Sequence, residues 1–117
     1  MTAAATLTGT ALVLHGHFYQ PPREDPWTGI VPEQPGAAPF HDWNERITAE
    51  CYRPNGWARI LGDHGRIVAI VDNYRRLSFD MGPTLLSWLE EHAPETYDRI
   101  VAADRVARPL PFRGRGA

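Results

Sequence analysis

The feature that most constrains the fold is an apolar run, residues 11–14, that leads directly into a polar segment beginning at His15 and ending in two prolines. The apolar run predicts a buried strand over residues 11–17. Side chains two positions apart share one face of a strand, so we expect His15 and His17 to point the same way where the strand ends. In α/β barrels and open α/β sheets, that end of the strands carries the ligand sites. The segment therefore predicts an α/β fold with a site at the end of its first strand.

Strand and helix signals alternate along the rest of the chain. Asp42 stands three residues before Glu45, a spacing typical of a helix N-cap, and Pro83 suits the first turn of a helix. The pattern predicts strands over residues 66–71 and 75–81 and helices over residues 43–52, 84–92 and 94–103. Asn55 and Gly56 predict a turn, and a long loop rich in proline and glycine over residues 18–40 is expected to be functional or disordered.

The alternation favours a parallel α/β sheet or barrel. Two or three strand–helix units leave sheet edges unpaired, and a complete (β/α) barrel takes about 250 residues, whereas this chain has 117. We therefore expect residues 1–107 to be the N-terminal portion of a larger barrel. Residues 108–117 have no apolar period, and we expect them to form a disordered tail.

Bulk composition narrows the possible partners. The formal charge of −2 gives no general attraction to nucleic acid or to an anionic membrane, and no apolar run approaches the roughly 20 residues of a membrane span. Cys51 is the only cysteine, so no internal disulfide can form. The N-terminus lacks the basic start of a secretory signal. We expect a cytoplasmic protein that binds neither nucleic acid nor membranes; its oligomeric state is left open.

Two functions are open for His15 and His17. Histidines at i and i+2 on a barrel strand can hold a divalent metal, which would imply a metal-dependent hydrolase of the amide or deacetylase type. Alternatively, they hydrogen-bond neighbouring groups or substrate hydroxyls at the mouth of a pocket. A metal also needs a carboxylate or a third histidine, and the spacing of the sequence identifies neither.

Five further residues are candidates for ligand contact. Tyr19 and Gln20 could form a sugar-facing edge, because aromatic faces stack on pyranose rings and amides hydrogen-bond hydroxyls; the alternative is an ordinary strand end. Trp43 and Asn44, beside the predicted cap, are freer to face a ligand. Asp80 ends a predicted strand, where it could contact substrate or cap the helix that follows.

Three segments, residues 15–23, 41–55 and 73–90, together resemble the N-terminal part of glycoside hydrolase family 57. The strongest match is the run from Ser78 to Glu90, Ser-Phe-Asp-Met-Gly-Pro-Thr-Leu-Leu-Ser-Trp-Leu-Glu. The chain is most similar to a branch related to the α-amylases and amylopullulanases of that family. The resemblance implies an incomplete barrel of seven strands, (β/α)7, which cleaves α-glucosidic bonds with retention and without a metal cofactor.

The first signature of the family, His-x-His-Gln-Pro, matches His15, His17, Gln20 and Pro21, with two aromatic residues inserted after His17. The resemblance implies that both histidines bind an α-glucan or oligosaccharide. It places the catalytic glutamate and aspartate on later strands that this chain does not reach, so no residue here is assigned to those roles, and we expect the chain alone to be inactive. A non-catalytic carbohydrate-binding or vestigial product is the other alternative.

Overall fold

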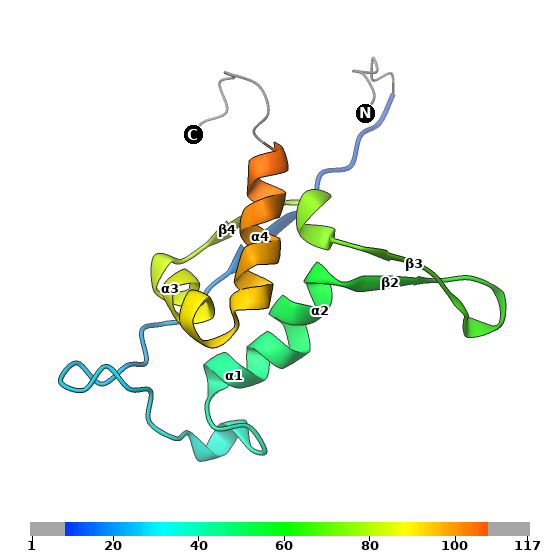
Figure 1. Cartoon of the computed structure of the whole chain (residues 1–117). Coiled ribbons are helices and arrows are strands. Elements are labelled where there is room, and N and C mark those ends of the chain that lie inside the picture. The colour runs from blue at the N-terminus through cyan, green and yellow to red at the C-terminus, as the bar shows by residue number, and fades with distance from the viewer. Residues whose placement is uncertain (1–8, 108–117) are drawn as a thin grey trace.

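The computed structural model describes residues 9–107 as a mixed α/β fold (Figure 1). Four strands, four α-helices, three 3₁₀ turns and one π-helical segment follow one another along this part of the chain. In order they are β1 (His15–Phe18), η1 (Pro35–Ala37), α1 (Trp43–Ile47), η2 (Thr48–Tyr52), α2 (Arg53–Gly56), β2 (Ala58–Leu61), η3 (Asp63–Gly65), β3 (Ile67–Val71), η4 (Asn73–Arg75), β4 (Ser78–Met81), α3 (Pro83–His92) and α4 (Pro94–Ala107). The predicted tail, residues 108–117, lies outside the described residues.

The strands form two separate pairs. β1 and β4 are parallel neighbours, with His15 opposite Ser78 and His17 opposite Asp80. A parallel pair needs a long crossover connection, and the loop, the helix over residues 43–56 and the β2–β3 hairpin provide it. The strand predicted over residues 66–71 is confirmed as β3, but it pairs antiparallel with β2 and does not join the parallel sheet. The described residues do not close a barrel.

One face of the parallel pair packs on the helices. Phe18 of β1 and Phe79 and Met81 of β4 contact the core, while the alternate residues of both strands face the other way. The buried core contains Val31, Tyr52, Tyr74, Leu85, Trp88, Leu89, Ile100 and Ala103. Leu85, Leu89 and Ile100, which come from α3 and α4, are among its most buried members.

The helix that starts at Trp43 is longer and less regular than the sequence predicts. Its cap is confirmed, because the Asp42 carboxylate accepts a hydrogen bond from the backbone N–H of Glu45 at 2.9 Å. The helix widens into a π-helical turn over η2 and continues to Gly56, so the predicted turn there is wrong. The wide turn ends two residues before Pro54, whose ring would clash with the carbonyl four residues back in a regular α-helix.

The prediction that residues 11–14 are buried in a strand is also wrong. Residues 11–14 are not part of β1, and Leu12 is 83% exposed, because no described segment covers the chain before the strand begins. Trp27 is 92% exposed. It lies in a tight turn in which the Asp25 carboxylate accepts hydrogen bonds from the backbone N–H groups of Trp27 and Thr28.

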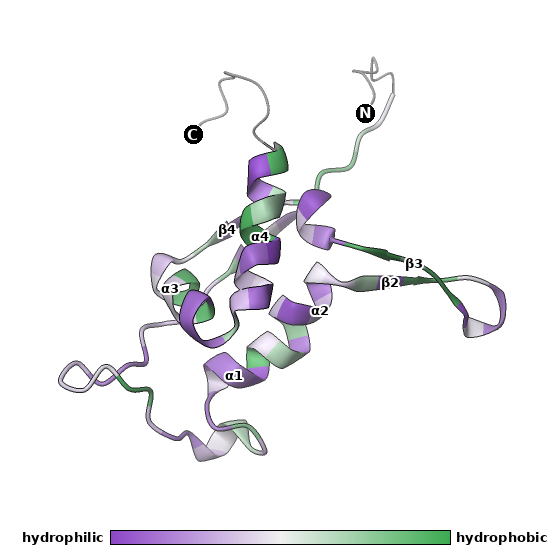
Figure 2. Cartoon of the chain, viewed as in Figure 1, coloured by the Kyte–Doolittle hydropathy of each residue, from purple (hydrophilic) through white to green (hydrophobic). Residues whose placement is uncertain are grey.

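The β2–β3 hairpin extends away from the helices (Figure 1), and most residues of its two strands are apolar (Figure 2). Its exposed apolar side chains are Ile60, Leu61, Ile67, Val68 and Ile70. No helix within residues 9–107 is long and apolar enough to cross a membrane.

Candidate functional site

Four polar side chains share the face of β1 and β4 that the helices leave open. We call this set, His15, His17, Ser78 and Asp80, the polar face. His15 Nδ1 lies 2.6 Å from Ser78 Oγ, and His17 Nδ1 donates to Asp80 Oδ1 at 2.6 Å. His15 Nε2 lies 3.5 Å from the other oxygen of the same carboxylate. The prediction that the two histidines point the same way is therefore confirmed, and both of them reach Asp80.

Asp80 belongs to the polar face and does not cap α3. The N-cap position of that helix is Gly82, which makes no side-chain capping bond, and the Asp80 carboxylate turns instead toward the two imidazoles. The hydrogen bond from His17 lowers the pKa of Asp80, and the nearby imidazoles lower it further. The carboxylate is thus kept ionised and accepts hydrogen bonds at neutral pH.

The polar face is open to a ligand. His15, His17 and Asp80 each expose more than half of their side chains. His17 Nδ1 carries the proton of the hydrogen bond to Asp80. In the neutral ring, Nε2 is therefore a hydrogen-bond acceptor. The face thus presents a carboxylate, imidazole nitrogens and a hydroxyl, which are suited to binding several hydroxyl groups at once.

Tyr19 extends the polar face at the C-terminal end of β1. Its ring is almost parallel to the His17 imidazole, with an interplanar angle of 2° and ring centroids 6.2 Å apart. The tyrosine is more than half exposed. An exposed aromatic face next to hydrogen-bonding groups combines apolar contact with polar recognition.

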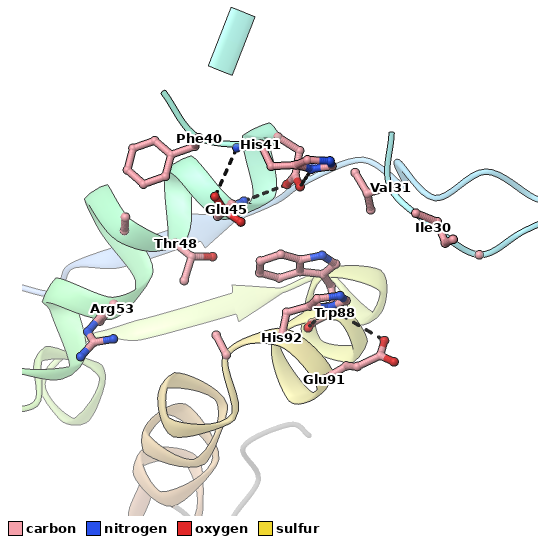
Figure 3. Close-up of a pocket in the computed structure, with 14 residues that line it drawn as sticks. Ile30, Val31, Phe40, His41, Glu45, Thr48, Arg53, Trp88, Glu91 and His92 are labelled. Atoms are coloured by element: carbon pink, nitrogen blue, oxygen red, sulfur yellow. Dashed lines mark hydrogen bonds and ion pairs between the residues drawn. The ribbon is translucent and has the colours of Figure 1, made fainter. Parts of the chain in front are cut away.

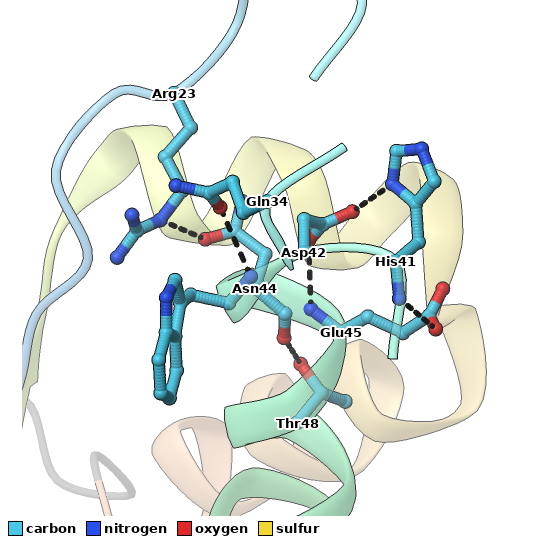
Figure 4. Close-up of polar contacts among 8 residues, drawn as sticks. Arg23, Gln34, His41, Asp42, Asn44, Glu45 and Thr48 are labelled. Atoms are coloured by element: carbon cyan, nitrogen blue, oxygen red, sulfur yellow. Dashed lines mark hydrogen bonds and ion pairs between the residues drawn. The ribbon is translucent and has the colours of Figure 1, made fainter. Parts of the chain in front are cut away.

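Gln20 and Asn44, which the sequence places among the candidates for ligand contact, lie in the packed interior and not at the polar face. Gln20, 9% exposed, donates to the Tyr52 hydroxyl at 2.9 Å and accepts from Arg23 Nη2 at 2.6 Å. The Nε of the same arginine donates to Asn44 Oδ1 at 3.1 Å (Figure 4). These bonds tie the segment after β1 to helix α1, so both amides position the loop that follows the polar face.

Trp43 likewise contacts residues of the fold that lie near it in the sequence. Its backbone N–H donates to Gln34 Oε1 at 3.0 Å, and the Arg46 guanidinium lies 5.1 Å from the centre of its ring. The indole also packs beside Gly36. The structure therefore brings three of the seven predicted ligand-contact residues, His15, His17 and Asp80, together on the polar face, with Tyr19 at its edge.

A cavity that the sequence did not indicate lies between the loop at Val31, helix α1 and the C-terminal end of α3 (Figure 3). The His92 imidazole stacks on the Trp88 indole with centroids 4.8 Å apart, a contact that the i, i+4 spacing on α3 could have revealed. On the other side, His41 hydrogen-bonds the Asp42 carboxylate at 2.8 Å, and this bond raises the pKa of His41. The imidazoles of His41 and His92 are thus both held in place by other residues that line the cavity.

No group of three or more His, Cys, Asp or Glu side chains within residues 9–107 is arranged to hold a metal ion. Comparison of the chain with protein-family models, with curated proteins and with solved structures finds no match.

Proposed function

We propose that this chain supplies the N-terminal, substrate-binding part of a (β/α)7-barrel glycoside hydrolase that acts on α-glucans. The observation that carries the proposal is the division of β1 and β4 into two faces. Phe18, Phe79 and Met81 pack on the helices, and His15, His17 and Asp80 lie on the opposite side. In a (β/α) barrel, each strand likewise directs alternate residues toward the helices and toward the interior. The polar face corresponds to that interior.

The chemistry of the polar face fits a sugar. A glucan presents hydroxyls that both donate and accept hydrogen bonds, and Asp80 and the two histidines offer matching groups. The exposed ring of Tyr19 supplies a flat apolar surface for a pyranose ring. Together these groups would bind one glucose unit at the C-terminal end of β1.

The polar face is proposed to bind substrate and not to break the glycosidic bond. Retaining glycosidases use two carboxyl groups about 5 Å apart, one of them a general acid with a raised pKa. Asp80 is the only carboxylate of the polar face, and its pKa is lowered by the bond from His17. It is suited to accepting a hydrogen bond from a hydroxyl and unsuited to donating a proton. The proposal therefore places the catalytic pair outside the described residues.

A titration of the chain with maltoheptaose tests the proposal. Binding is expected to shift the imidazole resonances of His15 and His17 in a saturable way, and His17→Ala is expected to weaken binding by roughly 10-fold or more, as for the loss of a ligand hydrogen bond. Arg66→Gln, on the exposed hairpin turn, is the control and should bind like wild type. The β-linked oligosaccharide cellohexaose tests linkage preference. Absence of a saturable shift in wild type, or equal affinity of wild type and His17→Ala read from the His15 resonance, would contradict the proposal.

A further inference from the structure

A second cavity, distinct from the one beside Trp88, lies where helix α2, strand β2 and the turn η4 meet. It has a volume of about 710 Å³, within the range of small-molecule sites. Its charged lining residues are Arg53 and Arg59, and no carboxylate lines it. Trp57, Asn55 and Asn73 provide the other polar or aromatic surface. None of these residues belongs to the polar face.

The two arginines are available to a ligand. Neither Arg53 nor Arg59 forms an ion pair with a carboxylate among residues 9–107, and both are exposed. The carboxylate next to Asn73, that of Asp72, is buried and pairs with Arg99 at 3.7 Å. Within residues 9–107, both guanidinium groups therefore lack a carboxylate at ion-pair distance and can pair with an anionic ligand.

The Trp57 ring contacts and orients the positively charged guanidinium group of Arg53. The Arg53 guanidinium carbon lies 5.8 Å from the centre of the Trp57 ring, within the range of a cation–π contact. Arg99 contacts the same ring at 5.2 Å and is itself fixed by its bond to the Gly56 carbonyl at 2.6 Å. A guanidinium held over an aromatic ring loses less freedom when it binds an anion, which favours binding.

An amide donor is also fixed at the edge of the cavity. Asn73 Nδ2 donates to Asn55 Oδ1 at 2.9 Å, and Asn55 in turn donates to the Cys51 carbonyl at 2.9 Å. Because a primary amide has two N–H groups, Asn73 keeps a second one for a ligand. The cavity thus combines two guanidinium groups and an oriented amide, all of them hydrogen-bond donors.

We propose that the cavity of Arg53, Trp57 and Arg59 binds a small phosphate monoester. Guanidinium groups bind phosphate oxygens in pairs of parallel hydrogen bonds, and a phosphate dianion matches two positive charges better than a monovalent carboxylate does. The ester group would occupy the rest of the cavity beside Pro54 and Ala58. This site is separate from the glucan site proposed above, and either can fail without the other.

The test follows the indole N–H resonance of Trp57, assigned with Trp57→Phe, while the 117-residue chain is titrated with inorganic phosphate, glucose 6-phosphate or adenosine monophosphate. Saturable shifts are expected with all three. The two esters should bind more tightly than inorganic phosphate, because they contact more of the cavity. The ester that binds better identifies the source of the phosphate.

Arg53→Gln and Arg59→Gln are each expected to weaken ester binding by about tenfold or more, the effect of losing a charged hydrogen bond. Arg59→Lys keeps the charge and should recover part of the loss. Arg66→Gln removes the same charge outside the cavity and should have no effect. A wild-type chain that does not bind, whether folded or not, an ester that binds no better than the bare ion, or an equal loss in Arg66→Gln would each overturn the proposal.

Discussion

Replacing Gly16 by alanine tests how β1 is held against the helices. Gly16 lies on the packed face of the strand, and a Cβ at this position would come within 2.8 Å of Cε2 and Cζ of Phe18. The Phe18 ring cannot move freely, because it packs edge-on against the rings of Tyr52, Tyr74 and Phe79 at centroid distances of 5.9, 5.7 and 6.3 Å. The alanine methyl group must therefore displace a ring that belongs to the core.

The magnitude follows from two opposing effects. Alanine in place of glycine within a strand ordinarily stabilises by roughly 0.5–1 kcal/mol, while forcing extra volume into a packed core costs about 1–3 kcal/mol. We expect Gly16→Ala to lower the free energy of unfolding by about 0.5–2 kcal/mol. In a Phe18→Leu background, which removes the clashing ring atoms, the same substitution should be neutral or stabilising.

Urea unfolding followed by circular dichroism, on wild type, both single variants and the double variant, measures this coupling. The expected result is an interaction energy between the two sites that offsets the whole cost of Gly16→Ala or exceeds it. If Gly16→Ala is as stable as wild type, or lowers the free energy of unfolding equally in both backgrounds, the Phe18 ring does not pack between Gly16 and the core. The orientation of His15 and His17 would then lose its support.

Three further predictions concern the helices and the segment before β1. Asp42→Ala should lower the free energy of unfolding by about 1 kcal/mol, as expected for loss of an N-cap, while Asp42→Asn should lower it less. His41 has a raised pKa, so its contribution to stability is full below the ordinary value of 6.5 and is lost as the pH rises through the raised value; urea midpoints of wild type and His41→Gln should differ more at acidic than at alkaline pH, and a constant difference would contradict this. Leu89→Ala, at a fully buried position, should cost about 2–5 kcal/mol, whereas Leu12→Ala, in the exposed segment, should stay within about 0.5 kcal/mol of wild type.

The features that the sequence predicts correctly depend on residues that lie close to one another in the chain. The cap at Asp42 and the helix after Pro83 depend on spacings of a few residues, and both are confirmed. The shared orientation of His15 and His17 follows from strand geometry alone, and the structure has it.

Contacts between distant residues could not be predicted in the same way. From the sequence, Asp80 is consistent with a helix cap or with a ligand site. Its position on the polar face depends on β4 lying beside β1, since Asp80 and its partner His17 are 63 residues apart in the chain. The amide of Gln20 has the chemistry of a sugar ligand, yet it is used by Tyr52 and Arg23 within the fold. An apolar run such as residues 11–14 predicts burial only if another segment covers it, and none of the described ones does.

A crystal structure of the chain soaked with maltoheptaose would show whether the polar face binds an α-glucan. We expect a glucose ring against Tyr19, with its hydroxyls within hydrogen-bond distance of His15, His17 or Asp80. Maltoheptaose bound only at another surface, or a polar face that stays free of sugar at saturating concentration, would contradict it.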